Sequence, residues 1–212
     1  YSQVSGAMTN ENPPDCLILA GGLSRRMGFD KASINMDGQT LLSRMVEVMI
    51  EHGMRTCVVL GPNSDECDID PDSVMFVRNN KPDLGRTGSI QIGLEALGWP
   101  EKVILAPIDR PGFSSKTLTI LMKADTSSCP EKDGRGGHPV MLDWRGITAI
   151  KKAKPNSSLK DLIKFSRIEV EDPHIHINVD TPEDVIFLKK AWNEICASWK
   201  VNSKRQQDHP AD

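Results

Sequence analysis

The sequence predicts a three-layer, doubly wound α/β fold with a mostly parallel central sheet. Short apolar runs recur along the chain and have the composition of strands that are buried on both faces. Amphipathic stretches with helical spacing separate the first of these runs, and glycine or proline lies close behind their ends. Because parallel strands need a long connection between them, usually a helix, this alternation favours a parallel sheet covered by helices.

The individual elements follow from the same patterns. Strands are expected at residues 16–20, 56–60, 74–77 and 102–108, with an edge strand at 168–171 and a final strand at 175–180. Helices are expected at residues 41–53, 89–98, 116–123, 144–153, 157–163 and 182–195. The last helix has a strong start signal, with Thr181 as N-cap and Pro182 at the first helical position. Polar loops are expected at residues 64–72 and 126–137.

Length and composition bound the organisation of the chain. Its 212 residues suffice for one hydrophobic core, and we expect a single domain over residues 15–199 with flexible segments at 1–14 and 200–212. A formal net charge of −3 argues against bulk nucleic-acid binding. The five scattered cysteines form no Cys-x-x-Cys pair, and no apolar run approaches a membrane span. We therefore expect a cytoplasmic protein that binds neither nucleic acid nor a membrane, and its oligomeric state stays open.

The most informative stretch is the end of the first strand and the turn behind it. This strand end and turn comprise Leu19, Ala20, Gly21 and Gly22, where the backbone can turn tightly and approach a ligand. Hydroxyl and cationic side chains follow within one loop length: Ser24, Arg25, Arg26 and Lys31. Such a turn favours a polyphosphate ligand. It lacks the Gly-Lys-Ser/Thr of a P-loop and the three glycines of a dinucleotide turn, which argues against an NAD-dependent oxidoreductase.

The order Leu-Ala-Gly-Gly, Arg-Met-Gly and Lys31 resembles the signature of the nucleotidyltransferases that attach a nucleotide to molybdopterin. The wider set includes the sugar-1-phosphate and methylerythritol-phosphate nucleotidyltransferases. The resemblance implies a Rossmann-like nucleotidyltransferase fold, a nucleoside triphosphate, a phosphorylated acceptor and Mg²⁺. The nucleotide-binding candidates in this first block are Leu19, Ala20, Gly21, Gly22, Ser24, Arg26 and Lys31.

A second glycine loop runs into the expected helix at residues 89–98 and contains Asn79, Gly88 and Ser89. A helix N-terminus presents free backbone N–H groups, which suit a base edge or a phosphate. In the resembled family this pattern contributes to recognition of the nucleobase and ribose. Helix capping is the alternative for Gly88 and Ser89, and the two interpretations are compatible.

The candidate metal ligands follow two expected strands. Asp109 ends the apolar run at 102–108, and ligands of parallel sheets sit beyond the carboxyl ends of the strands. The resembled family has a metal-binding Asp-x-Pro, which implies that Asp109 is a magnesium ligand. Alternation places Asn178 and Asp180 on one face, where their oxygens can join Asp109 around the cation. Which of these two is the direct ligand stays open, and Asp180 has a structural alternative at a helix N-terminus.

The string Gly-His-Pro-Val at residues 137–140 resembles the stretch near the acceptor pocket of molybdopterin nucleotidyltransferases. Gly137 and His138 are therefore the acceptor-binding candidates. The chain departs from the cytidylyl branch where that branch has a Gly-Asp-x-Gly turn.

Together, these observations predict a magnesium-dependent nucleotidyltransferase that releases pyrophosphate, with Arg26, Lys31 and Asp109 as catalytic residues. GTP and CTP are both favoured, because different motifs resemble the guanylyl and cytidylyl branches. The acceptor is molybdopterin or, alternatively, a sugar phosphate or small alcohol phosphate. A nucleotide-binding domain without turnover is the alternative from another class, and the joint presence of these three residues argues against it.

Overall fold

The computed structural model describes residues 12–21, 30–62, 64 and 69–200. Within them, an eight-stranded sheet has the order β10-β7-β9-β6-β1-β4-β5, and β8 pairs with β7. Its strands are β1 (Asp15–Leu19), β4 (Thr56–Leu60), β5 (Met75–Arg78), β6 (Lys102–Pro107), β7 (Ser128–Lys132), β8 (Arg135–Gly136), β9 (Val140–Asp143) and β10 (Ser166–Glu169). A separate hairpin consists of β2 (Asn35–Met36) and β3 (Gln39–Thr40).

Helices connect and cover these strands. They are α1 (Leu41–Glu51), α2 (Arg86–Ala96), α3 (Ser115–Met122), α4 (Trp144–Lys152), α5 (Leu159–Leu162) and α6 (Pro182–Trp199), with 3₁₀ turns η1 (Lys31–Ser33) and η2 (Pro82–Leu84). No helix in the described ranges is both long and apolar enough to span a bilayer.

The sheet is mostly parallel, as predicted. Strands β6, β1, β4 and β5 are parallel neighbours, so their carboxyl ends meet at one edge. Strand β9 enters antiparallel between β6 and β7, and β10 pairs parallel with β7 at the far end. The expected edge strand near residues 168–171 is therefore confirmed as β10.

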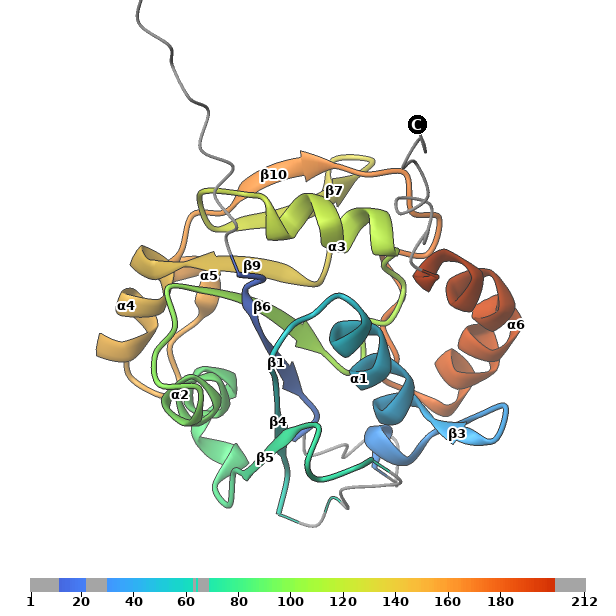
Figure 1. Ribbon diagram of the computed structural model, residues 1–212, viewed down its shortest axis with the longest axis horizontal. Coiled ribbons are helices and arrows are strands. Elements are labelled where there is room, and N and C mark those ends of the chain that lie inside the picture. Colours follow the sequence, from blue (N-terminus) through green and yellow to red (C-terminus); the bar gives the residue numbers. More distant parts are fainter. Residues whose placement is uncertain (1–11, 22–29, 63, 65–68, 201–212) are drawn as a thin grey trace, which may run out of the picture.

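Two hydrophobic cores make the fold three-layered. Along β1, Cys16 and Ile18 face the core shared with α1, α3 and α6, whereas Leu17 and Leu19 face the core shared with α2 and α4. Successive side chains of a strand point to opposite faces, so both faces of this central strand must be apolar. Figure 1 shows α1, α3 and α6 on one side of the sheet and α2, α4 and α5 on the other.

The prediction of a polar loop at residues 126–137 is wrong, because this segment contains β7 and β8, which form an antiparallel pair. The connection between β7 and β8 consists of Asp133 and Gly134, which both adopt positive φ angles. Turn residues therefore dominate the composition of this segment and hide its short strands. Strand β9, which follows, was likewise not expected as a strand. Its residues are all buried, so it shows no alternation of apolar and polar side chains.

The prediction of a final strand at residues 175–180 is also wrong, because this segment pairs with no strand in the part of the chain that the structure describes. Its alternation is real: Ile175, Ile177 and Val179 are buried, and the polar residues between them are half-buried. The Val179 N–H donates to the Asp109 carbonyl oxygen at 3.0 Å, which ties the segment to the end of β6. Burial with period two thus arises here from irregular backbone packed on the core.

The helix starts depart from expectation in two places. Helix α2 begins at Arg86, three residues before the expected start, and Gly85 is its N-cap. Capping by Gly88 or Ser89 is therefore ruled out. Helix α5 is a single turn without a side-chain cap, shorter than the expected 157–163. The start of α6 is confirmed, since Thr181 and Asp184 form a capping box with Pro182 in the first turn.

This capping box carries a pH-dependent prediction. Asp184 Oδ2 accepts from the Asp180 and Thr181 N–H groups at 2.9 and 2.8 Å, and the Asp180 N–H is the main cause that lowers the pKa of Asp184. A carboxyl whose pKa is lower in the folded state stabilises the fold above its unfolded pKa, and this contribution disappears as the pH falls through the folded pKa. We expect Asp184→Ala to lower the free energy of unfolding by about 1 kcal/mol at pH 7. The loss should shrink below about pH 4.

Urea unfolding at pH 7 and pH 3 measures this difference. Glu183→Ala is the matched control, because Glu183 is an exposed acid in the same helical turn. An equal effect of both substitutions, or a loss that stays constant with pH, would contradict the prediction.

Candidate active site

A cavity of about 180 Å³ lies at the carboxyl ends of β1 and β6. It is lined by Leu19, Ala20 and Gly21 behind β1, by Pro107, Ile108 and Asp109 at the end of β6, and by Lys31, Pro82, Gly85, Arg86 and Ser89. Strands β1 and β6 are parallel, and the Ile108 N–H donates to the Leu19 carbonyl oxygen at 3.0 Å. Gly21, at the end of β1, and Asp109, at the end of β6, therefore share one edge of the sheet.

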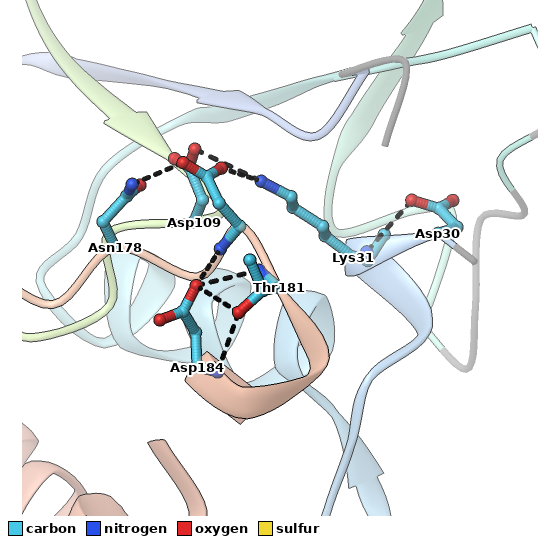
Figure 2. A network of polar contacts seen from close by, with 8 residues as sticks. Asp30, Lys31, Asp109, Asn178, Thr181 and Asp184 are labelled. Carbon is cyan, nitrogen blue, oxygen red and sulfur yellow. Dashed lines mark hydrogen bonds and ion pairs between the residues drawn. The ribbon is translucent and has the colours of Figure 1, made fainter. Parts of the chain in front are cut away.

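Lys31 joins two carboxylates that come from distant parts of the chain. Its Nζ lies 2.6 Å from Asp180 Oδ1 and 3.6 Å from Asp109 Oδ2. Asp30, the N-cap of η1, accepts a hydrogen bond from the Ala32 N–H and so stabilises the turn from which Lys31 projects. Figure 2 shows the extended lysine side chain reaching from this turn toward Asp109.

Asp180 is held from both sides. Its Oδ1 accepts from Lys31, and its Oδ2 accepts from Asn178 Nδ2 at 2.5 Å. The hydrogen bond from Lys31 is the main cause that lowers the pKa of Asp180, and the Asn178 amide adds to it. Asp180 is therefore an ionised carboxylate at neutral pH, and Asn178 supports it from behind. The two residues lie together as expected, although the segment is not a strand.

Gly21 is required by the protein's own backbone. A Cβ at this position would lie 2.8 Å from the Leu60 carbonyl carbon and 2.9 Å from the Gly61 nitrogen. The sequence predicts that this glycine lets a ligand approach, and Gly21 does line the cavity. The end of β4 is a second reason for a glycine here, because it occupies the space that a Cβ would need. Gly21 thus lets the backbone at the end of β1 pack against the backbone at the end of β4.

The second glycine loop divides between two cavities. Buried Asn79 donates from Nδ2 to Ser89 Oγ at 2.9 Å, and Ser89 lines the cavity beside Asp109. Asn79 and Gly88 line a different cavity of about 520 Å³ beside Trp99. The Gly88 N–H donates to the Pro155 carbonyl oxygen at 3.0 Å. Asn79 therefore orients Ser89, while Gly88 packs against the segment that follows α4.

The start of α2 is a part of the site that the sequence did not predict. Gly85 adopts a φ of 113°, and a Cβ there would lie 2.7 Å from the Pro155 carbonyl oxygen. No side chain caps α2, and Gly85 and Arg86 both line the cavity. The first N–H groups of a helix lack intrahelical partners and attract anions. A glycine before a helix is a weak signal, and only its spatial position shows its relevance.

His138 lies close enough to Arg110, Arg86 and Asp109 for their charges to act on its imidazole. Burial is the main cause that lowers the pKa of His138 to about 4; Arg110 and Arg86 add to the effect, and Asp109 opposes it. Its Nδ1 is buried and has no hydrogen-bond partner within the described ranges. The imidazole is therefore neutral at pH 7. Gly137, its neighbour, is required by packing, since a Cβ would lie 2.7 Å from Ile175 Cγ1.

Arg110, the middle residue of Asp109-Arg110-Pro111, was also missed. It is half-buried; this burial lowers the pKa of its guanidinium, and Asp109 and Asp180 oppose the shift. Its guanidinium makes no hydrogen bond or ion pair to any residue that the structure describes. A nearby cation without a partner among the described residues can bind a second anion. The sequence signal for Arg110 is the cation inside the Asp-x-Pro string.

Three predicted nucleotide contacts, Gly22, Ser24 and Arg26, lie outside the described residues. Their roles stay predictions. Hydrogen bonds and ion pairs connect four predicted site residues from three distant parts of the sequence: Lys31, Asp109, Asn178 and Asp180.

The carboxylates meet the chemical requirements of a magnesium site that the substrate completes. The described ranges contain no group of three or more His, Cys, Asp or Glu side chains placed to hold a metal. Asp109 and Asp180 nevertheless converge on one cation, the Lys31 ammonium. Magnesium is commonly held by one or two carboxylates together with substrate phosphates and water. The residues present therefore fit this ion.

The cavity lies at the carboxyl ends of the parallel strands β1 and β6, the edge at which α/β proteins with open parallel sheets bind their ligands. Residues 16–172 match the MobA-like NTP transferase domain, and the chain belongs to this family. Its class of enzyme is therefore nucleotidyltransferase.

Two curated relatives come from bacteria. The molybdenum cofactor cytidylyltransferase of Escherichia coli is 25% identical over 194 residues, which cover 85% of this chain and 98% of that protein. The molybdenum cofactor guanylyltransferase of Xanthomonas euvesicatoria is 29% identical over 122 residues, or 58% of this chain and 60% of that protein.

Solved structures bear out the fold. A nucleotidyl transferase from Methanothermobacter has a TM-score of 0.71 at 20% identity, covering 86% of this chain and 99% of that one. The molybdopterin-guanine dinucleotide biosynthesis protein A from Archaeoglobus fulgidus has a TM-score of 0.61 at 16% identity, covering 85% and 99%. The expected Rossmann-like nucleotidyltransferase fold is thereby confirmed.

Proposed function

We propose that this protein transfers a nucleoside monophosphate from GTP or CTP to a phosphorylated acceptor such as molybdopterin, with magnesium as cofactor. The observation that carries the proposal is the convergence of Lys31, Asp109 and Asp180 beside the cavity at the ends of β1 and β6. Both substrates are anions, so the enzyme must screen their repulsion and hold them in line. A site that combines carboxylates for a metal with cations for phosphate meets both needs.

Asp109 and Asp180 are the residues that would hold magnesium, and Asn178 would orient Asp180. When bound, the ion supplies a Lewis acid and a template at the α-phosphate. The hydrogen bond of Asn178 to Asp180 supports Asp180 as the direct ligand and Asn178 as its support.

The chain's own residues bind the triphosphate. The N-terminus of α2, together with Arg86, presents positive charge to the cavity. Lys31 would neutralise the charge that develops on the leaving pyrophosphate. Ser89, oriented by Asn79, offers a hydroxyl to the nucleotide. Gly22, Ser24 and Arg26 would complete this shell, as the motif predicts.

The reaction needs no protein nucleophile. A phosphate oxygen of the acceptor attacks the α-phosphorus, the bond between this phosphorus and the β-bridging oxygen breaks, and pyrophosphate leaves. The buried thiols do not compete for this role: burial raises the pKa of Cys57 to about 12, and it raises the pKa of Cys16 further. The enzyme contributes position and charge.

A panel of the four ribonucleoside triphosphates, with and without magnesium, tests the proposal in a thermal-shift experiment. A ligand that binds the folded state raises the melting temperature by mass action. We expect GTP or CTP with magnesium to give the largest shift. Pyrophosphate release is then measured with molybdopterin, a sugar 1-phosphate and methylerythritol phosphate as acceptors. Binding without turnover on any acceptor would overturn the proposal.

Arg110 carries a prediction about the acceptor. We expect Arg110→Gln to raise the KM for the phosphorylated acceptor about 10- to 100-fold, because a charge-assisted hydrogen bond to phosphate is lost. The KM for the triphosphate should change little. Arg145→Gln, which removes an exposed guanidinium on α4, is the control. An increase confined to the triphosphate KM would place Arg110 on the nucleotide side instead.

A further inference from the structure

We infer that Lys31 is an internal counterion that competes with the divalent cation for Asp109 and Asp180, so that tight metal binding requires the triphosphate. The inference deepens the proposed function and rests on it, since it assigns these two carboxylates to the metal. It makes Lys31 the residue that selects the metal–triphosphate complex over the free metal ion.

The contacts of Asp180 show why the two cations compete. Its Oδ1 is bonded to the Lys31 ammonium at 2.6 Å, and its Oδ2 is bonded to the Asn178 amide. The Asp180 N–H is bonded to Asp184, so the backbone at this position is held as well. Both carboxylate oxygens are therefore engaged. A metal ion at Oδ1 could use the second lone pair of this oxygen, but it would then stand beside the ammonium, and the two positive charges would repel each other.

Asp109 is affected by the same lysine. Lys31 Nζ lies 3.6 Å from Asp109 Oδ2 and 2.6 Å from Asp180 Oδ1, so one positive charge contacts both carboxylates that would hold a metal. The Lys31 side chain is only 12% exposed, and water therefore screens its charge poorly. A divalent ion entering the free protein would meet this charge at close range. Free metal should bind weakly.

The triphosphate offers Lys31 another partner. The same lysine lines the cavity together with Gly21, Gly85 and Arg86, so its ammonium can turn to phosphate oxygens without leaving the site. That movement frees Asp180 Oδ1 and leaves a net charge of −2 on the two carboxylates. Metal and triphosphate then strengthen each other's binding, and thermodynamic linkage requires the factor to be the same in both directions.

Manganese binding to the nucleotide-free protein tests the inference without any turnover. The electron paramagnetic resonance signal of free Mn²⁺ measures the metal affinity of wild type, Lys31→Gln and Lys31→Arg. We expect Lys31→Gln to bind Mn²⁺ at least about tenfold more tightly than wild type, because the competing charge is gone. Lys31→Arg keeps a cation and should bind as weakly as wild type. Lys116→Gln, on the exposed face of α3, is the charge-matched control.

Two further measurements make the result specific. In an Asp180→Asn background, Lys31→Gln should no longer tighten Mn²⁺ binding, because the contested oxygen ligand is altered. In wild type, saturating Mn²⁺ should tighten the binding of a triphosphate analogue with a methylene α,β-bridge, measured by calorimetry. This last measurement needs no variant, so it stands even if a substitution impairs folding.

The outcomes separate the two proposals. Equal or weaker Mn²⁺ binding by folded Lys31→Gln, or no coupling between Mn²⁺ and the analogue in wild type, overturns the counterion role. Pyrophosphate release by wild type in the presence of magnesium would then still support the proposed function. Tighter Mn²⁺ binding by Lys31→Gln, together with no turnover by the wild-type protein on any acceptor, would instead uphold the competition and overturn the proposed function.

Discussion

The Asp109→Asn variant is expected to release pyrophosphate about 10²–10³-fold more slowly than wild type. The amide preserves the size of the side chain but removes the charge that would hold the metal at the end of β6. Asp109 lines the cavity and lies 3.6 Å from Lys31, so the substitution also leaves the ammonium with Asp180 alone. The loss should appear in kcat, because the polarised α-phosphate is a feature of the transition state.

Steady-state pyrophosphate release at saturating magnesium measures this effect. Asp125→Asn is the matched control, since the Asp125 side chain is 95% exposed and pairs with Lys102 at the opposite end of β6. Thermal melts of both variants separate loss of function from loss of fold. Near wild-type turnover by Asp109→Asn would remove this residue from the catalytic group.

The Lys31→Ala variant is expected to lower turnover by about 10²–10³-fold. Its ammonium is the described cation that contacts both carboxylates, and in the proposed reaction it meets the growing charge of the leaving pyrophosphate. The expected pattern is unusual, because the same truncation should raise metal affinity while lowering kcat. If weaker metal binding were the only cause of the lost activity, the Mn²⁺ titration would show a lower metal affinity than that of wild type.

Pyrophosphate release over a range of magnesium concentrations checks this prediction. Lys116→Ala, which removes an exposed lysine paired with Glu171, serves as the control. If Lys31→Ala kept wild-type turnover, Lys31 would have a structural role only. If added magnesium restored the activity, Lys31 would act through metal affinity and not through the leaving group.

Local patterns predicted the central strands and the start of α6 well. The buried run at β1, the apolar run at β6 and the N-cap chemistry of Thr181 each depend on residues within a few positions of one another. The same locality explains the errors. Apolar and polar residues alternate at 175–180 because every second side chain is buried. Such burial does not require the segment to pair with a strand.

The site shows the same division. The resemblance and the strand ends led to Lys31, Asp109, Asn178 and Asp180, and these residues do converge. Arg110 lies inside the Asp-x-Pro string, but the string does not show that its guanidinium makes no hydrogen bond or ion pair to the described residues. The start of α2 was missed because its position beside Asp109 depends on contacts between distant segments.

By itself, the sequence determined which segments are apolar enough to be buried and where charged turns interrupt them, because these properties belong to neighbouring residues. It thereby determined the class of fold and the first glycine turn. Only the tertiary structure decided the order of the strands, the antiparallel insertion of β9 and the pairing of Lys31 with Asp180, 149 residues apart. Such contacts depend on how the whole sheet assembles around two cores, and that assembly brings distant charges into one cavity.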